Sequence, residues 1–349
     1  MTRFPLSRAR ACALVGLAQL GLAATAHAQS SVQLYGLVDM SVGRFQTAGT
    51  ARTWRAESGN MTTSFIGFKG TEDLGGGLKA TFQLESFLRA DSGDSGRFNG
   101  DVFWARAANV GLAGDFGALT FGRVTNQFFV STLIFNAFGD SFGFSPSIRQ
   151  VLTPRAGMQP FYGDTGWSNA ALYASPKFGG FSANLQANLG EGAAGAVGKN
   201  IGGNVLYFGG PFSATVAVQQ VKNNNGRPFT PVAGFDAQDS VQVGAAWDFG
   251  AAKLMGQYSQ TKTKAAVDTK STYMGLGASV PLGAGKLLAQ YGRSKAELGT
   301  GSDPVHKTLT VGYDHYLSKQ TDLYAVLMND KFTGAQTGNT LAAGIRLRF

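Results

Sequence analysis

Several residue types that define common classes of protein are scarce in this chain. It has one cysteine among 349 residues, so a disulfide framework is excluded. Charged residues make up 15%, against roughly 25% in an average soluble domain. After residue 28, no apolar run approaches the ~20 residues that a membrane-spanning helix needs. With 44% hydrophobic residues the chain is also not disordered.

Glycine and aromatic residues are abundant instead. The chain holds 49 Gly, 26 Phe and 10 Tyr, and its 30 Lys and Arg exceed its 21 Asp and Glu. Glycine supplies the backbone angles of tight turns, and aromatic residues favour strands. This composition predicts an all-β fold with many strands joined by short turns.

The first 28 residues have the pattern of a secretory signal peptide. Three arginines and no acid are followed by an apolar run over 11–24 and then by Ala26-His27-Ala28. The alternative, a short membrane anchor, is disfavoured because the run is too short to span a bilayer. We expect cleavage after Ala28, which removes Cys12 and leaves 29–349 as a single domain.

Apolar and polar residues alternate along many segments. In 181–189 apolar residues occupy every second position, with Ser, Asn and Gln between them. The segments 32–42, 241–248 and 341–349 repeat this pattern. A period of two indicates strands with one apolar and one polar face.

Short turns rich in Gly, Pro and Asp separate these segments in pairs. Their seven centres lie near residues 75, 116, 178, 210, 250, 283 and 319. Seven hairpins, an opening strand and a closing strand predict sixteen strands. Longer polar loops lie between the hairpins, at roughly 46–61, 90–101, 125–165, 190–203, 222–238, 263–270, 295–305 and 332–339. Tight turns at one end and long loops at the other are typical of an outer-membrane barrel.

A soluble β-sandwich also alternates apolar and polar faces. Strands of up to ~10 residues exceed the ~5–6 that are usual in globular sheets. The polar faces hold mostly uncharged residues, as a water-filled interior would. A barrel of ~16–18 strands leaves an aqueous channel. We therefore expect a transmembrane, sixteen-stranded antiparallel barrel.

Specific motifs carry a resemblance to a known family. They are SVQLYGLVD at 31–39, IGFKGTEDLGGGLKA at 66–80, VGL at 110–112, FGR at 121–123, YASP at 173–176 and the terminal Phe349. In these motifs the chain resembles the general porins of Gram-negative bacteria, the β-proteobacterial porins in particular. The resemblance implies a homotrimer in the outer membrane, next to lipopolysaccharide, reached after export to the periplasm. It also implies passive diffusion of small hydrophilic solutes and ions, without a cofactor.

The third loop, residues 125–165, is the longest insertion. Loops beyond ~12–15 residues in a compact domain are usually functional. This one contains eight Phe and Tyr residues, which are unfavourable on an exposed loop tip. Its acids are Asp140 and Asp164. We expect the loop to fold into the barrel and to filter solutes by size.

The resembling family faces this acidic loop with arginines on the opposite wall. Arg106 matches one of those wall arginines. Phe65 stands where the family often has Arg, and Gly166 stands where Arg commonly precedes the segment around Asn169. The resemblance therefore implies an eyelet with fewer positive charges, wider and more aromatic than is usual.

Two acids and two bases on the polar strand faces complete the candidate pore residues. Asp39 and Glu85 would either bind cations or face water without a partner. Arg346 and Arg348 would be either lumenal charges that attract anions or solvated rim charges. We favour rim charges, because both residues lie near the short turns.

Other classes of function fit the sequence less well than a channel does. The two histidines of the exported chain, His306 and His315, lie on opposite faces of one strand, so they cannot converge on one site. No nucleophile or zinc motif is present in the sequence, so we expect neither an enzyme nor a metal site. Nucleic acid is not an expected partner, because the basic residues are dispersed. The remaining alternative is an adhesive barrel with little conductance.

Overall fold

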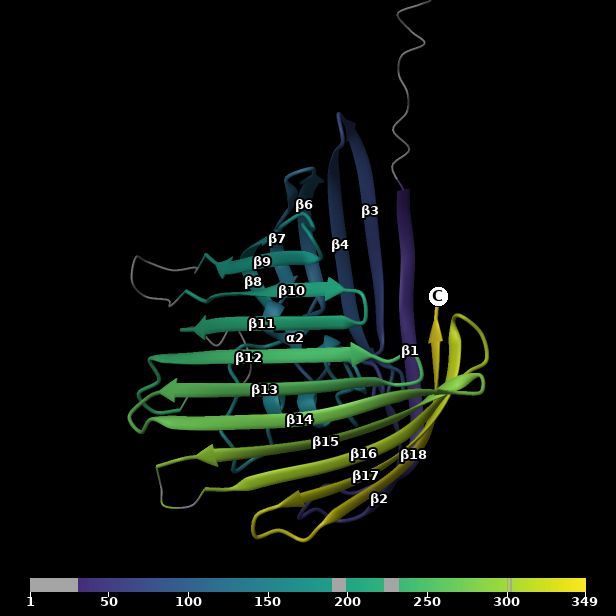
Figure 1. Cartoon of the computed structure of the whole chain (residues 1–349), viewed down its shortest axis with the longest axis vertical. Helices are drawn as coiled ribbons and strands as arrows, with labels where there is room; N and C mark the ends of the chain where they lie inside the picture. The colour runs from purple at the N-terminus through teal and green to yellow at the C-terminus, as the bar shows by residue number, and fades with distance from the viewer. Residues whose placement is uncertain (1–30, 190–198, 223–231, 300, 302) are drawn as a thin grey trace, which may run out of the picture.

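A computed structural model describes residues 31–189, 199–222, 232–299, 301 and 303–349 as one antiparallel β-barrel (Figure 1). The predicted signal peptide, 1–28, lies outside the described residues. Over the described residues, no helix has the length and apolar character needed to cross a membrane.

The strands follow one another around the barrel in chain order. They are β1 (Ser31–Phe45), β2 (Thr53–Ser58), β3 (Phe65–Gly75), β4 (Leu78–Arg89), β5 (Asp94–Ser95), β6 (Ala107–Gly114), β7 (Gly117–Thr125), β8 (Gly166–Ala174), β9 (Phe181–Asn188), β10 (Ile201–Gly209), β11 (Phe212–Val221), β12 (Ala237–Asp248), β13 (Lys253–Lys264), β14 (Thr269–Leu282), β15 (Gly285–Glu297), β16 (Val305–Tyr316), β17 (Thr321–Phe332) and β18 (Gly338–Arg348).

The wall itself consists of sixteen strands, as the sequence predicts. β2 and β3 pair with successive halves of β1, so together they form one interrupted wall strand. β5 pairs only with the last residues of β4, outside the main sheet. On its other edge β1 pairs with β18, which closes the ring. Gly36 and Phe349 complete the closure by exchanging both of their backbone hydrogen bonds, at 3.0 and 3.2 Å.

All seven predicted short turns lie between consecutive antiparallel strands. The β3–β4 turn shows why glycine is needed there, because Gly75, Gly76 and Gly77 have φ of +84°, +59° and +81°. L-residues with side chains rarely adopt such angles. Figure 1 shows this hairpin rising above the strands β10–β17.

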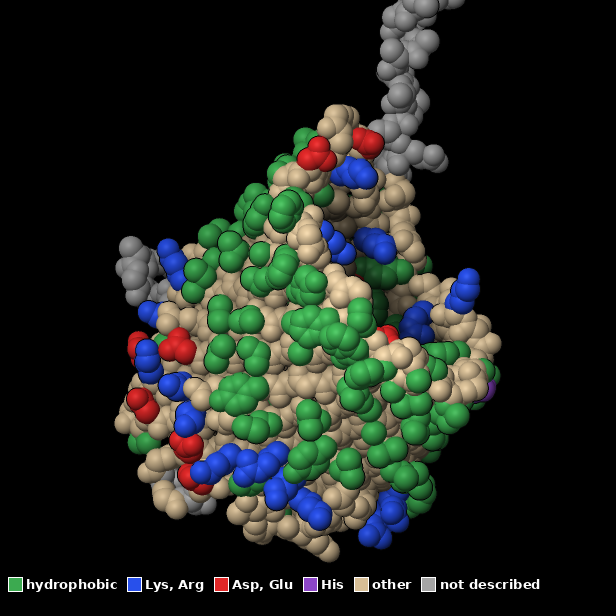
Figure 2. All heavy atoms as spheres, in the orientation of Figure 1, with side chains coloured by type: hydrophobic (Ala, Val, Ile, Leu, Met, Phe, Trp, Pro, Cys, Tyr) green, Lys and Arg blue, Asp and Glu red, His purple; other side chains and the backbone are tan. Residues whose placement is uncertain are grey.

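The two faces of the wall differ as the alternation requires. Along β16, Leu309 and Val311 are exposed at 47% and 37%, whereas the neighbouring Thr308 and Thr310 are buried at 1% and 0%. Figure 2 shows hydrophobic side chains spread over the middle of the outer surface. An apolar outer band and a polar interior are what a membrane barrel presents.

Aromatic side chains gather at the short-turn end of β9–β13. Rings of Phe181, Tyr207, Phe212, Trp247 and Phe249 follow one another with centroids 4.6 to 6.2 Å apart. Such a girdle is typical of a membrane–water interface.

The third loop lies inside the ring of strands. It contains helix α2 (Gln127–Ile134), whose N-cap Asn126 accepts a hydrogen bond from the Phe128 amide, and the π-helical turn η1 (Ile148–Leu152). The largest hydrophobic clusters form between this loop and the wall, and they include Phe135, Phe138 and Phe144. The aromatic residues thus bury themselves against the wall, as predicted.

Candidate functional site: the channel constriction

The third loop is fixed to the wall by a series of inward-facing polar side chains. Asn126, Thr132 and Ser147 bond Gln219, Gln242 and Gln257 at 2.9, 2.8 and 2.6 Å. Further along, Gln150 donates to Thr308 and Gln159 to Thr263, at 2.9 and 2.6 Å, and the Tyr162 amide donates to Gln238 at 2.8 Å. The loop is therefore held on β11, β12, β13 and β16.

Glycines on the inner wall let the loop lie close. A Cβ on Gly244 would stand 2.9 Å from the Cβ of Phe135, and one on Gly292 would stand 2.7 Å from the Cβ of Pro146. Real Cβ atoms are essentially never that close to another heavy atom. The wall is thus contoured to fit the loop at these two points.

Arg106 lies on the wall that the loop leaves open, just before β6. It forms an ion pair with Glu85 of β4, and its guanidinium carbon lies 3.9 Å from the centroid of the Phe65 ring. Glu85 also accepts hydrogen bonds from Tyr35 and, at 2.9 Å, from Gln83. Glu85 is 3% exposed in its side chain, whereas Arg106 is 31% exposed. Of this pair, the arginine is therefore the group that meets the water of the channel.

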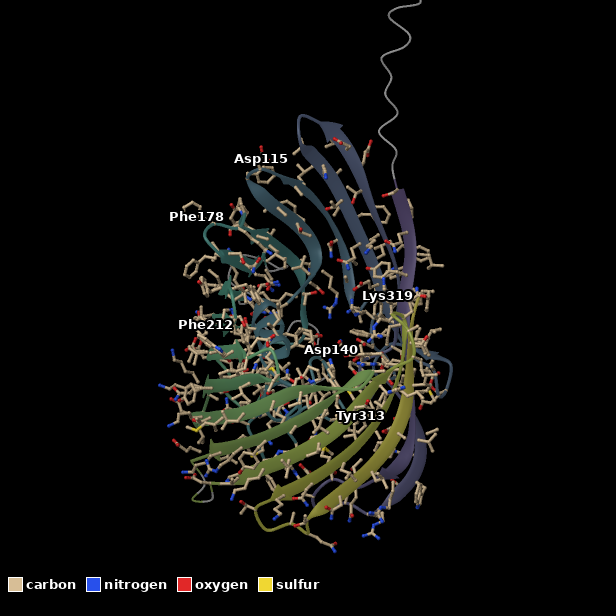
Figure 3. The ribbon with its side chains drawn as sticks, turned by 45° about the vertical axis from the view of Figure 1, so that its right-hand side comes forward. Asp115, Asp140, Phe178, Phe212, Tyr313 and Lys319 are labelled. Atoms are coloured by element: carbon tan, nitrogen blue, oxygen red, sulfur yellow. The ribbon has the colours of Figure 1, made fainter. Side chains whose placement is uncertain are left out.

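Asp140 occupies the middle of the barrel interior (Figure 3). Its carboxylate accepts a 3.2 Å hydrogen bond from Thr62, and the Thr62 hydroxyl accepts one from Arg346 at 3.0 Å. Burial raises the pKa of Asp140 above its usual range, against the opposing influence of Arg106 and the Thr62 hydrogen bond. The positive charge of Arg106 therefore favours the ionised form of Asp140.

Arg346 is not a solvated rim charge, contrary to our expectation. It is 8% exposed and pairs with Asp314 at 2.9 Å and with Asp322 at 2.7 Å. Arg348, which also pairs with Asp322, at 2.6 Å, is the more exposed of the two. The alternation along β18 turns both arginines inward, and acids of β16 and β17 neutralise them.

Asp39 serves the wall rather than the water of the channel. It is fully buried and accepts hydrogen bonds from the Met61 and Thr62 amides at 2.6 and 2.8 Å and from the Tyr324 hydroxyl at 2.6 Å. It thereby fixes the segment between β2 and β3 that carries Thr62.

Asp164 lies apart from Asp140, at the end of the third loop. It pairs with Arg97 at 2.8 Å and with Arg123 at 3.2 Å, and it is 2% exposed. Arg97 also pairs with Asp101 at 2.8 Å. Although burial acts to raise it, the pKa of Asp101 is held below its usual range by Arg97. This cluster fixes the loop before β6 against the wall and buries Asp164 away from passing solutes.

Two cavities flank the constriction. The inner cavity, of about 540 Å³, includes Gln83 and Lys69 in its lining. The outer cavity, of about 760 Å³, begins at Leu88 and is lined by Arg55, Arg89, Arg97 and Arg149 and by the acids Glu57 and Asp91. Glu85 lies between Gln83 and Leu88 on β4, so its pair with Arg106 stands where the two cavities meet.

Of the candidate pore residues, the structure gathers Arg106, Glu85 and Phe65 in one cluster, and Asp140 is hydrogen-bonded to Thr62 in the segment just before Phe65. Asp39 and Asp164 are buried elsewhere. Arg97 and Arg123 were not predicted as site residues. Arg123 belongs to the FGR motif at 121–123, whereas no local pattern marks Arg97. Within the described ranges, no group of three His, Cys, Asp or Glu is placed to hold a metal ion.

Comparisons with known proteins agree with this geometry. A family model described as "Gram-negative porin" matches residues 11–335. "Outer membrane porin protein 32" of Delftia acidovorans is 35% identical over 95% of this chain and 93% of that protein. An outer membrane porin protein of Bordetella pertussis is 28% identical over 94% and 97%. The solved structure titled "Anion-selective porin from Comamonas acidovorans" is similar with a TM-score of 0.77 and 31% identity, covering 92% of this chain and all of that one.

Proposed function

Because this chain belongs to the Gram-negative porin family, we propose that its third loop is the size filter of the channel that it forms. The protein is a channel of the Gram-negative outer membrane for the passive diffusion of small solutes. The observation that supports the filter is the attachment of residues 126–162 to strands β11–β13 and β16, which holds a folded segment across the lumen.

We further propose a preference for anions that arises mainly in the two cavities. Among the described residues of their linings, Lys69 and Arg149 are bases outside any ion pair, against one such acid, Asp91. Arg55, Arg89 and Arg97 are each paired with an acid. At the constriction itself, the charge of Arg106 is offset by Glu85 and Asp140. Low-dielectric walls screen charges poorly, so an excess of bases along the path favours anions.

A homotrimer is the assembly that we propose. Outward apolar side chains on β1, such as Val32 and Leu34, are exposed at 67% and 53% and offer a surface for close packing. Mass measurement in mild detergent tests this, and a monomer alone would contradict it. We also infer that the chain is not an enzyme, because the relatives named above are porins.

Planar-bilayer recording tests the channel and its selectivity together. Purified protein should insert in conductance steps, and a salt gradient should give a reversal potential of the sign expected for anions. Conductance steps with a reversal potential of the sign expected for cations would contradict the anion preference but would still support a channel. The absence of steps from folded protein would favour the adhesive barrel.

A further inference from the structure

The wall strand formed by β2 and β3 is interrupted by residues 59–64. β2 ends with Ser58 opposite Met40, and β3 begins with Phe65 opposite Leu37. Six residues therefore stand opposite only two residues of β1. A bulge of this kind leaves backbone groups outside the ladder and re-aims side chains. We call residues 59–64 the bulge segment.

The third loop turns back where it reaches the bulge segment. Before that point, successive loop residues lie against glycines of successive parts of the wall: Phe135 against Gly244 of β12, Ala137 against Gly277 of β14 and Phe138 against Gly312 of β16. After it, Pro146 lies against Gly292 of β15. We call residues 140–143, at the turning point, the loop tip. The loop tip is attached to a different part of the wall from the strands whose glutamines hold the rest of the loop.

Three hydrogen bonds join the loop tip to the bulge segment. The Asn60 carbonyl accepts one from the Ser141 hydroxyl at 2.6 Å and one from the Gly143 amide at 3.0 Å. The Thr62 hydroxyl donates the third to Asp140 at 3.2 Å. The approach is close, because a Cβ on Gly143 would stand 2.9 Å from the Cβ of Asn60. The interruption of the wall therefore supplies the groups that the loop tip binds.

The wall supports the bulge segment in turn. The Asn60 side chain donates to the Ser41 hydroxyl at 2.9 Å and to Glu57 at 3.0 Å. Asp39 accepts the backbone amides of residues 61 and 62 at 2.6 and 2.8 Å. The bulge segment is therefore fixed to β1 and β2, and it can hold the loop tip in place.

Thr62 joins the loop tip to a charge of the wall. Its hydroxyl has one proton, which it donates to Asp140, and its oxygen accepts a hydrogen bond from Arg346 at 3.0 Å. The bond from Arg346 fixes the hydroxyl so that its proton is directed at the carboxylate. A hydrogen bond donated to a carboxylate favours its ionised form. Thr62 therefore acts on both the position and the charge of Asp140.

We propose that the bulge segment determines the ion selectivity of the channel by holding the loop tip, and that Thr62 is the positioning residue for the carboxylate of Asp140. This inference rests on the proposed function of the third loop as the filter. The glutamines of β11–β13 fix the path of the loop along the wall. The bulge segment fixes the one part of the loop that brings an acid to the constriction.

Thr62→Val tests the positioning role, because it keeps the shape of the side chain and removes the hydroxyl. Asp140 then loses a donor, and a hydrogen bond to a charged group corresponds to about one pH unit. We expect the change in selectivity that Asp140 produces on acidification to move upward by that amount, measured from reversal potentials in dilute salt. Thr62→Ser keeps the hydroxyl and should restore the midpoint of the parent. An unchanged midpoint in Thr62→Val, or the same shift in Thr62→Ser, would overturn the proposal.

A disulfide between the bulge segment and the loop tip tests the attachment itself. Asn60→Cys/Gly143→Cys places two Cβ atoms so close that a shift of about 1 Å allows a bridge. The bridged form should show no more current fluctuation than the parent. Reduction should increase the fluctuation severalfold, because the new Cβ at position 143 displaces the loop tip and the Asn60 side chain is gone.

The matched control for the cysteine pair is Asn60→Ser/Gly143→Ser, which cannot form a bridge. It should resemble the reduced cysteine pair and should not respond to the reductant. Equal fluctuation in the bridged and reduced forms of the cysteine pair would reject the role of the bulge segment.

Measurements on the parent keep this inference apart from the proposed function. A folded parent without conductance steps would reject the filter, and this inference with it. If the parent conducts and its selectivity changes with pH, while Thr62→Val and the reduced cysteine pair behave as the parent does, only this inference fails. Heat-modifiable migration checks that each variant is folded. If Thr62→Val does not fold, the cysteine pair decides the outcome.

Discussion

The guanidinium of Arg106 lies over the ring of Phe65, 3.9 Å from its centroid. The resemblance to porins implied a missing charge at position 65. The structure shows instead that Phe65 packs against the guanidinium of Arg106, and that Glu85 forms an ion pair with the same arginine. An aromatic residue here helps to hold the guanidinium of Arg106 in place.

Arg106→Ala should shift the permeability of the channel toward cations, with unit conductance unchanged or higher. The variant leaves the negative charges of Glu85 and Asp140 unopposed. A charge ~4 Å away contributes ~1 kcal/mol even in water, so we expect about a fivefold change in the anion-to-cation permeability ratio. Reversal potentials in dilute salt measure it, because screening is least there.

The matched control for Arg106→Ala is Lys319→Ala, in the turn between β16 and β17. If Arg106→Ala and Lys319→Ala give the same reversal potential as the parent, Arg106 does not act on passing ions.

Phe65→Arg should shift selectivity toward anions and lower unit conductance, because it adds a second long cationic side chain beside Arg106. Phe65→Leu is the neutral control, since it removes the ring without adding charge. An anion shift in both variants would show that the packing around Arg106, and not the added charge, controls selectivity.

Asp140 should make the ion selectivity change with pH, at a pH above the one at which an ordinary aspartate titrates. Its pKa is raised by burial, and a carboxyl group is charged above its pKa and neutral below it. As the pH falls, Asp140 should therefore lose its charge early, and the preference for anions should increase. Asp140→Asn should abolish this step, whereas Asp115→Asn, in the turn between β6 and β7, should keep it. An identical pH profile in Asp140→Asn and the parent would contradict the assignment.

Ser147→Ala should loosen the third loop without unfolding the barrel. The Ser147 hydroxyl bonds Gln257, Tyr273 and Gln290 at 2.6, 2.8 and 2.7 Å, so its loss leaves buried polar groups unpaired at ~1–3 kcal/mol each. Single-channel recordings should show more current fluctuation in this variant. Ser318→Ala, in a short turn, is the control, and equal noise in both would argue against the role of Ser147.

The orientation of the barrel is testable with single cysteines, because we expect the exported chain to have none. Thr337→Cys, between β17 and β18, should react with an impermeant thiol reagent on intact cells. Ala251→Cys, between β12 and β13, should react only after the outer membrane is permeabilised. The reverse pattern would mean that the long loops face the periplasm.

The sequence predicted the wall well, because strands and turns follow local rules. Gly75-Gly76-Gly77 needs no distant residue to form a turn, and the alternation over 341–349 turns Arg346 inward regardless of its partners. Its position near the short turns predicts a rim charge for Arg346. The acids that neutralise it, Asp314 and Asp322, lie on other strands, where no local pattern reveals them.

The constriction was less predictable, because its contacts join residues far apart in the chain. Asp39 is buried by Tyr324, 285 residues later. The inward glutamines suggested a water-filled interior, yet Gln219, Gln242 and Gln257 hold the third loop. The alternation predicts which side of the wall a residue faces, but it does not predict which residues that side chain contacts there.

The closure between β1 and β18 also constrains how the protein is assembled. Their paired residues, such as Val42 and Ala343, stand at opposite ends of the chain, so this barrel has contacts of very high sequence separation and should fold slowly. Until Phe349 reaches Gly36, two strand edges stay open, and open edges invite pairing with other chains. Pairing of the final strand, β18, with β1 therefore completes the barrel. Without β18, the edges of β1 and β17 that it covers would stay open to pairing with other chains.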